Sequence, residues 1–173
     1  MSCTILTGIT LDCKGSNAGG IKALYISEKA GVSAVLPLAS SIVSTISRAN
    51  DKKFYKFELW NKTINSASIG DPMDTSNGSV VFKQTLSVQF PKLTGERNDI
   101  FDSLIRTSTL IIAETKAGKF FLLGRDNGME VTSGTAPTGA AIGDFSGYTL
   151  EFTGEELNYG PEVLASIIPG LLV

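Results

Sequence analysis

The strongest constraint on the fold lies at residues 78–90, which read GSVVFKQTLSVQF. Val80, Phe82, Leu86, Val88 and Phe90 share one parity, interrupted only by a glutamine at position 84. The other parity is mostly polar. Alternation with a period of two is typical of a strand that covers a core with one face and meets water with the other. The segment therefore predicts a sheet that is buried on one side.

Further apolar runs predict strands at 19–27, 41–48, 52–60, 109–116, 118–124 and 147–156. Only the segment 93–108 has helical spacing, with a stripe formed by Leu93, Arg97, Ile100, Phe101, Leu104 and Ile105. It predicts one α-helix over about 94–107, with Thr94 as its N-cap. These elements indicate a mainly β fold, a β-sandwich or barrel with one flanking α-helix. A chain of 173 residues predicts a single domain over 1–173.

Two segments of this domain suggest contacts beyond its core. Residues 61–77 lie between two predicted strands and carry turn chemistry at GDP and SNG, which predicts a long β-hairpin over about 54–90 with its tip at 61–77. The C-terminal stretch 157–173 is an apolar arm that either folds back on its own core or docks on a neighbouring subunit. Both alternatives remain open, because leaving its apolar side chains exposed would favour aggregation.

The composition argues against several classes of function. The chain has no histidine, which removes the commonest general base and metal ligand. The glycine-rich run 133–154 lacks the lysine of a phosphate-binding loop, since Ala140 and Ala141 stand where Lys and Ser/Thr are needed. We therefore expect no catalytic residues, no cofactor and no metal site. Charged residues make up only 18% of the chain against 42% hydrophobic ones, which suggests that part of the surface meets other protein.

The two cysteines and the chain start bear on the compartment. Cys3 and Cys13 flank a segment symmetric about Gly8, so a hairpin can bring the thiols together, and whether they pair stays open. The first residues do not read as a signal peptide, which favours reduced thiols in a protein made in the cytosol. No apolar stretch approaches the length of a membrane span, so no membrane anchor is expected.

Two stretches resemble a known family. LTGITLDCKGSNAGGIKALYI (6–26) and FFLLGRDNGMEVTSGTAPTGAAIGDFSGYTLEFTGEE (120–156) are similar to the opening and closing parts of small virion structural proteins from tailed phages of Bacteroidetes-type hosts. Together they cover about a third of the chain. The resemblance points to a tail tube protein, or to a close relative that forms a neck or tail ring.

The resemblance implies a homo-oligomer of stacked, usually hexameric rings in the virion tail, whose lumen DNA traverses without specific binding. A hairpin from each subunit would line the channel, the glycine-rich run would allow close subunit packing, and other tail or neck proteins would be partners. The assembly interface predicted on this basis comprises Trp60, Ile64, Ile69, Asp71, Met73, Asp74, Ile167, Ile168, Leu171 and Leu172.

Two other hypotheses stay open beside the tail tube. A single-ring neck or tail-completion protein would share the fold without stacking. A β-sandwich binding module of a tail fibre or baseplate would use Trp60 and Tyr159 as a platform for a carbohydrate or host surface. A hydrolase ranks last, because it would need carboxylates alone.

Overall fold

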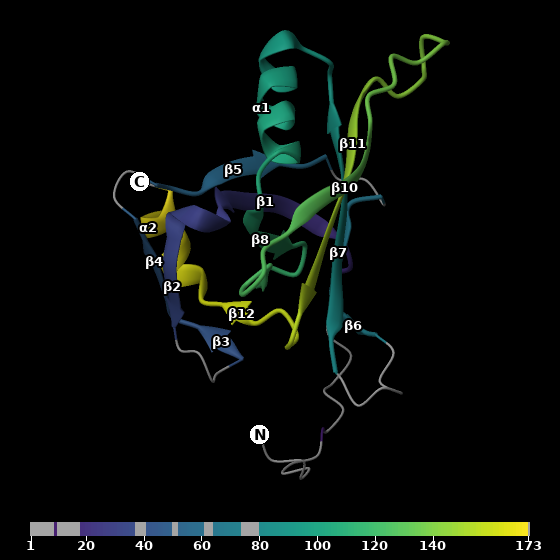
Figure 1. The fold of residues 1–173 in the computed structure, drawn as a ribbon. Coiled ribbons are helices and arrows are strands. Elements are labelled where there is room, and N and C mark those ends of the chain that lie inside the picture. The colour runs from purple at the N-terminus through teal and green to yellow at the C-terminus, as the bar shows by residue number, and fades with distance from the viewer. Residues whose placement is uncertain are drawn as a thin grey trace.

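The computed structural model describes residues 9, 18–36, 41–49, 52–60, 64–73 and 80–172, which form three sheets and two α-helices (Figure 1). The six-stranded sheet contains, in spatial order, β3 (Ile42–Val43), β12 (Glu162–Val163), β9 (Phe120–Leu123), β8 (Thr109–Thr115), β1 (Ile21–Glu28) and β5 (Tyr55–Glu58). The four-stranded sheet contains β10 (Glu130–Thr135), β11 (Gly147–Glu156), β7 (Phe82–Pro91) and β6 (Ser66–Pro72). β2 (Val32–Leu36) and β4 (Thr45–Arg48) form a separate pair.

The helices are α1 (Gly95–Ile105) and α2 (Ile168–Leu171), and short 3-10 turns occupy Lys29–Gly31 and Ala165–Ile167. The fold class is thus mainly β, with a sandwich-like arrangement of sheets, as the alternation at 78–90 predicted. Cys3, Cys13 and Asp74 lie outside the described residues.

The six-stranded sheet is the central layer because β1 and β8 bury side chains on both faces. Leu24, Ile26 and Ile111 face the four-stranded sheet and α1, in a core completed by residues such as Leu86 and Phe152. Tyr25, Leu110 and Ile112 point the other way, towards β2, β4 and the C-terminal helix. The nearly continuous apolar run of β8 is typical of such a doubly buried strand. The sandwich therefore has a third layer that the sequence did not predict.

The predicted hairpin over 54–90 needs correction. β5 pairs with β1, in the six-stranded sheet, through contacts such as Leu24 opposite Phe57. The strand that folds back on β7 is β6, so the hairpin arms are Ser66–Pro72 and Phe82–Pro91. The partner of β5 is fixed by long-range packing of Phe57 against the first core, which no local pattern reveals.

The C-terminal arm follows the first of the two alternatives and packs on its own chain. Ile168 and Leu171 are buried in the second core, and Ile167 and Leu172 are half-buried against it. The arm's carbonyls are also fixed, because Arg48 donates hydrogen bonds to both Gly170 and Leu171 at 2.9 Å. These four apolar residues, which we predicted in the assembly interface, all pack against the second core of their own subunit, and whether they also contact a neighbouring subunit stays a prediction.

Helix α1 forms close to where the stripe predicted it, but it is less buried than predicted. Phe101 is its only buried residue. Phe101 packs against Phe90 and Tyr148, with ring centroids 5.1 and 4.4 Å apart. Ile100 and Ile105, expected on the inner face, are exposed. Thr94 occupies the N-cap position without a capping hydrogen bond from its side chain.

Candidate assembly surface

The four-stranded sheet has one polar face, which we call the outer face. Tyr148, Leu150 and Phe152 of β11 point into the first core together with Leu86 and Val88 of β7. The alternate residues point outwards, and the register places them in cross-strand pairs such as Thr149 with Gln89, Glu151 with Ser87 and Thr153 with Thr85. Because side chains alternate across a strand, the same pattern that builds the core builds this polar face.

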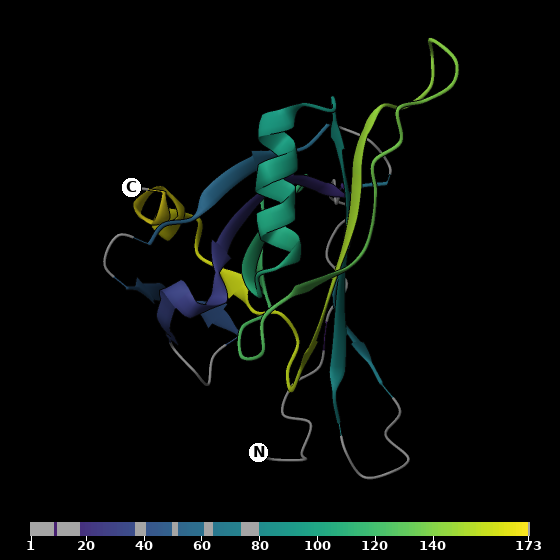
Figure 2. The same cartoon turned by 45° about the horizontal axis from the view of Figure 1, so that its top comes forward.

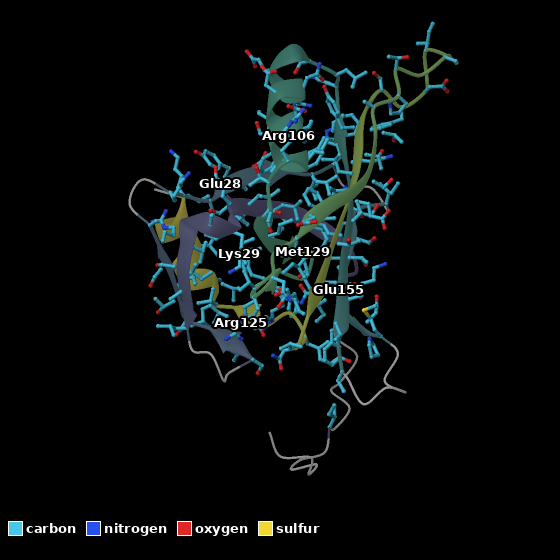
Figure 3. All side chains as sticks on the ribbon, in the orientation of Figure 1. Glu28, Lys29, Arg106, Arg125, Met129 and Glu155 are labelled. Atoms are coloured by element: carbon cyan, nitrogen blue, oxygen red, sulfur yellow. The ribbon has the colours of Figure 1, made fainter. Side chains whose placement is uncertain are left out.

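The outer face is acidic. Register with β11 and β7 places four carboxylates on it, those of Asp71, Glu130, Glu151 and Glu155. In the described part of the sheet the single cation on this face is Lys83, which lies opposite Glu155 on one side and Asp71 on the other. Figure 3 labels Glu155 on β11. A surface with this excess of negative charge repels a polyanion such as DNA.

Both edges of this sheet are open within the described residues, where no strand pairs with the outer side of β10 or of β6. An open edge presents unpaired backbone N–H and C=O groups to a further strand. Residues 132–135 of β10 are exposed. A register shift interrupts each edge, between Val131 and Ser133 on β10 and between Ser68 and Asp71 on β6. A partner strand must follow these bends, so the shifts restrict which strand can pair there.

Local packing holds β6 in place beside β7. Gly70 lies under the ring of Tyr159, where a Cβ would stand 2.7 Å from the tyrosine Cδ1 atom. The same ring packs on Phe82, with centroids 4.4 Å apart. At the start of the strand the buried Asn65 donates to the carbonyl of Trp60 at 2.6 Å and accepts from the backbone N–H of Gln89 at 2.9 Å. The edge is therefore held by side chains from outside β6.

The predicted interface residues of the hairpin fall into three groups. Trp60, Ile64 and Met73 are exposed and available for contact with another chain. Ile69 is half-buried and packs against the first core. Asp71 is exposed, accepts a hydrogen bond from Ser68 at 2.8 Å and belongs to the acidic outer face.

The glycine-rich run forms the end of β10, the start of β11 and the loop 136–146 between them. Figures 1 and 2 show this loop extending away from both sheets, and Figure 2 shows it reaching past the end of α1. Its shape is set by Asp144, whose carboxylate accepts the backbone N–H groups of Ala140 at 2.9 Å and Ala141 at 2.7 Å. These hydrogen bonds lower the pKa of Asp144. Ile142, at the turn, is fully exposed.

Two grooves flank helix α1. The larger, of about 490 Å³, lies between α1 and the β10–β11 hairpin, and residues 131–136 of β10 and its loop form one wall. The smaller, of about 350 Å³, lies between α1 and strands β1 and β5. We call the smaller one the β5 groove, and its apolar walls are Ile26, Tyr55, Phe57, Ile100 and Leu104. Tyr55 and Ile100 are exposed there.

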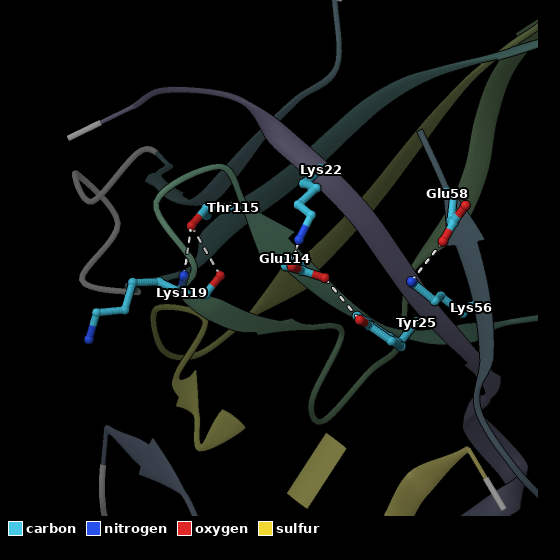
Figure 4. A network of polar contacts seen from close by, with 7 residues as sticks. All are labelled: Lys22, Tyr25, Lys56, Glu58, Glu114, Thr115 and Lys119. Carbon is cyan, nitrogen blue, oxygen red and sulfur yellow. Dashed lines mark hydrogen bonds and ion pairs between the residues drawn. The ribbon is translucent and has the colours of Figure 1, made fainter. Parts of the chain in front are cut away.

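The buried carboxylates do not form an acid–base pair. Glu114 of β8 accepts hydrogen bonds from Lys22 at 2.8 Å and Tyr25 at 2.9 Å (Figure 4). Burial opposes ionisation of this carboxyl, but the hydrogen bonds from Lys22 and Tyr25 outweigh it, and the pKa of Glu114 is lowered. Burial and the Glu114 contacts raise the pKa of Tyr25 to about 12. This network ties β1 to β8.

Glu156 lies at the end of β11 and closes a turn. Its carboxylate accepts the backbone N–H of Asp126 at 3.0 Å and of Asn127 at 2.9 Å. Burial raises the pKa of Glu156, although these N–H groups act in the opposite direction. Neither Glu156 nor Glu114 lines either groove beside α1. Both side chains therefore have structural partners that account for their burial.

Comparisons with protein-family models, with curated proteins and with solved structures found no match to this chain. Within the described ranges, no group of three or more Cys, Asp or Glu side chains is placed to hold a metal ion. No helix in those ranges is long and apolar enough to cross a membrane.

Sequence reasoning missed two features of this surface. The signal that could have indicated the acidic outer face is the alternation of Glu151, Thr153 and Glu155 with inward aromatic and aliphatic residues. The β10 edge gave no such signal, because EVTSGT has few apolar residues and resembles a loop.

Proposed function

We propose that this protein is a non-enzymatic structural subunit that assembles into rings, and that the rings stack as the tail tube of a tailed phage. The observation that carries the proposal is the four-stranded sheet with two open edges and an acidic outer face. The resemblance of residues 6–26 and 120–156 to virion proteins of tailed phages supports the same assignment. Virion localisation and tail or neck proteins as partners follow from it.

Pairing of β10 in one subunit with β6 in the next joins two different surfaces. A contact between unlike surfaces repeats from copy to copy and closes into a ring when its rotation allows. Closure leaves no free edge on the four-stranded sheets, and it makes their outer faces continuous. The cores and α1 then lie on the outside of this joined sheet.

Six such sheets would form a barrel of about 24 strands, which at ~4.8 Å per strand has a backbone diameter of roughly 37 Å before strand tilt widens it. Side chains narrow the channel from all sides. With four carboxylates and one lysine per subunit, the joined face carries a negative charge around its whole circumference. Such a wall keeps DNA from binding as it passes.

The experiment is negative-stain electron microscopy of the purified protein and of Thr132→Pro across a concentration series. Thr132 has no register partner on β11, because it lies at the shift between Val131 and Ser133. Proline is tolerated at bulges and edges but cannot donate to a further strand. We expect hollow filaments of constant width from the unaltered protein and from the control Thr132→Ala, and dispersed subunits from Thr132→Pro.

Circular dichroism and thermal unfolding establish that Thr132→Pro keeps the fold. Filaments formed normally by Thr132→Pro would contradict edge pairing through β10. Isolated rings would assign the protein to the neck or tail-completion role. Compact monomers at every concentration, with saturable glycan binding that depends on Trp60 or Tyr159, would assign it to the binding-module role.

A further inference from the structure

We infer that the loop 136–146 of one subunit inserts into the β5 groove of a second copy, with Ile142 as the side chain that fills the groove. This contact rests on the proposed self-assembly and adds a second point of attachment to it. It involves neither edge of the four-stranded sheet.

The loop is built to present an apolar side chain away from its own subunit. Ile142 is fully exposed, and the described residues of this subunit do not cover it. The hydrogen bonds from Ala140 and Ala141 to Asp144 fix the turn around it, so little conformational freedom remains to be lost on docking. Gly139 adopts φ +76°, where a Cβ would stand 2.8 Å from the Cβ of Asp144. The turn is therefore preformed.

The β5 groove offers the complementary surface. Most of its exposed lining is apolar surface, to which Tyr55 and Ile100 contribute exposed side chains, and the remaining lining residues are Ser27, Glu28, Ser103, Thr107 and Thr109. Both grooves are lined partly by hydroxyl residues, but the groove beside β10 is the poorer receptor because a larger share of its lining surface is polar. Figure 3 shows Glu28, which lines the β5 groove, on the opposite side of α1 from the loop. A subunit cannot fill its own groove with a loop held on the other side of the helix.

The charges at the two surfaces also match. Asp144 is the only charged side chain of the loop 136–146. At the rim of the groove Lys53 places its Nζ atom over the Tyr55 ring, 5.7 Å from the centroid. Glu28, the acid in the groove wall, is already paired with Lys52 at 2.7 Å. An incoming loop therefore brings the Asp144 carboxylate to a rim where Glu28 is already neutralised by Lys52 and Lys53 is exposed.

A single loop in a groove buries much less than the roughly 1,200 Å² that marks the lower end of stable interfaces. It holds copies together only where other contacts already bring them close, as between subunits joined through their sheets. Because the loop and the groove are different surfaces, the contact runs in one direction from copy to copy.

The experiment is disulfide cross-linking between two single-cysteine variants in a Cys3→Ser, Cys13→Ser background. One variant carries Ile142→Cys and the other Ser103→Cys, at an exposed helix position in the β5 groove. After mixing and mild oxidation, we expect a dimer band that neither variant gives alone. The matched control is Asp102→Cys, at the preceding helix position, which lines the groove beside β10 instead. We expect no band from its mixture with Ile142→Cys.

Assembly of Ile142→Asp is measured alongside, and we expect it to require at least about tenfold higher protein concentration than the unaltered chain. Ordered filaments or rings without the 142–103 cross-link would overturn this inference and leave the proposed function standing. A cross-link from position 142 to position 102 would also overturn it, by placing the loop in the other groove. Monomers at all concentrations would contradict both proposals.

Discussion

Truncation of Leu171 tests whether the C-terminal arm stabilises its own subunit. Leu171 is only 5% exposed, within the second core beside Ile168. Its carbonyl accepts hydrogen bonds from the backbone N–H of Phe54 and from Arg48, each at 2.9 Å, and these contacts survive truncation of the side chain. Leu171→Ala therefore removes packing alone. Buried leucine-to-alanine changes cost about 2.7–5.0 kcal/mol, and we expect about 3 kcal/mol here because a site near the chain end can relax.

For a domain of this size, that loss corresponds to a fall in Tm of roughly 6–12 °C. The assay is thermal unfolding followed by circular dichroism, at a protein concentration where sedimentation shows only monomer. Leu164→Ala is the matched control, because Leu164 belongs to the same segment and is 43% exposed. We expect it to cost less than about 1 kcal/mol. If Leu171→Ala left the monomer's Tm unchanged and weakened assembly instead, the arm would be acting on a neighbouring subunit.

Two further changes test the charged groups. The double variant Glu151→Lys, Glu155→Lys turns the net charge of the outer face from negative to positive. We therefore expect assembled particles of this variant to retain duplex DNA in a salt-dependent way, whereas particles of the unaltered protein retain none. The assay is filter binding at two ionic strengths. Binding that is equally weak in both proteins would place the outer face away from the channel. Because burial raises the pKa of Glu156 in the folded state above the ordinary 4.5, the stability that its neutral form provides is present below that value and is lost as pH rises through the folded pKa. We therefore expect Glu156→Gln to gain stability relative to the unaltered protein in urea unfolding as the pH rises above 4.5, and a difference independent of pH would contradict the assignment.

The parts of the fold that the sequence predicted are those with local signals. The alternation at 78–90 locates β7, and the helical stripe locates α1, because each reports which residues face a core. Gln84 is a residue whose burial this reasoning does not explain. It interrupts the apolar parity, yet it is buried, because its amide accepts from the backbone N–H of Gly124 at 2.9 Å and donates to the carbonyl of Ile69 at 3.3 Å. Partners this distant in sequence leave no local trace.

The sequence-based prediction of strand pairing was wrong for the same reason. β6 reads SASIGDP, whose small residues and turn chemistry favour a loop, and it becomes a strand because β7 and Tyr159 hold it. For α1 the error was the opposite one, because the sequence predicted burial where the structure shows exposure. Ile100 and Ile105 fit the apolar stripe, but the helix rests on the core mainly through Phe101, and the grooves on its two sides leave both isoleucines accessible. Their exposure is a property of how the helix docks, which periodicity does not encode.

The proposed assembly would account for both the open edges and the low charge content. An edge strand that stays exposed is normally protected by lysine, proline or a cover from another element. β10 carries neither lysine nor proline, and the loop beyond it presents an uncovered isoleucine at its turn. As a permanent monomer, such a chain would have little more than the register shift on β10 to limit unwanted pairing at this edge. In the proposed closed ring the same edge would pair with β6 of the next subunit, and the register shifts on both strands would favour a partner strand that follows them. On this proposal, the features that would be liabilities in an isolated chain would be the ones that direct assembly.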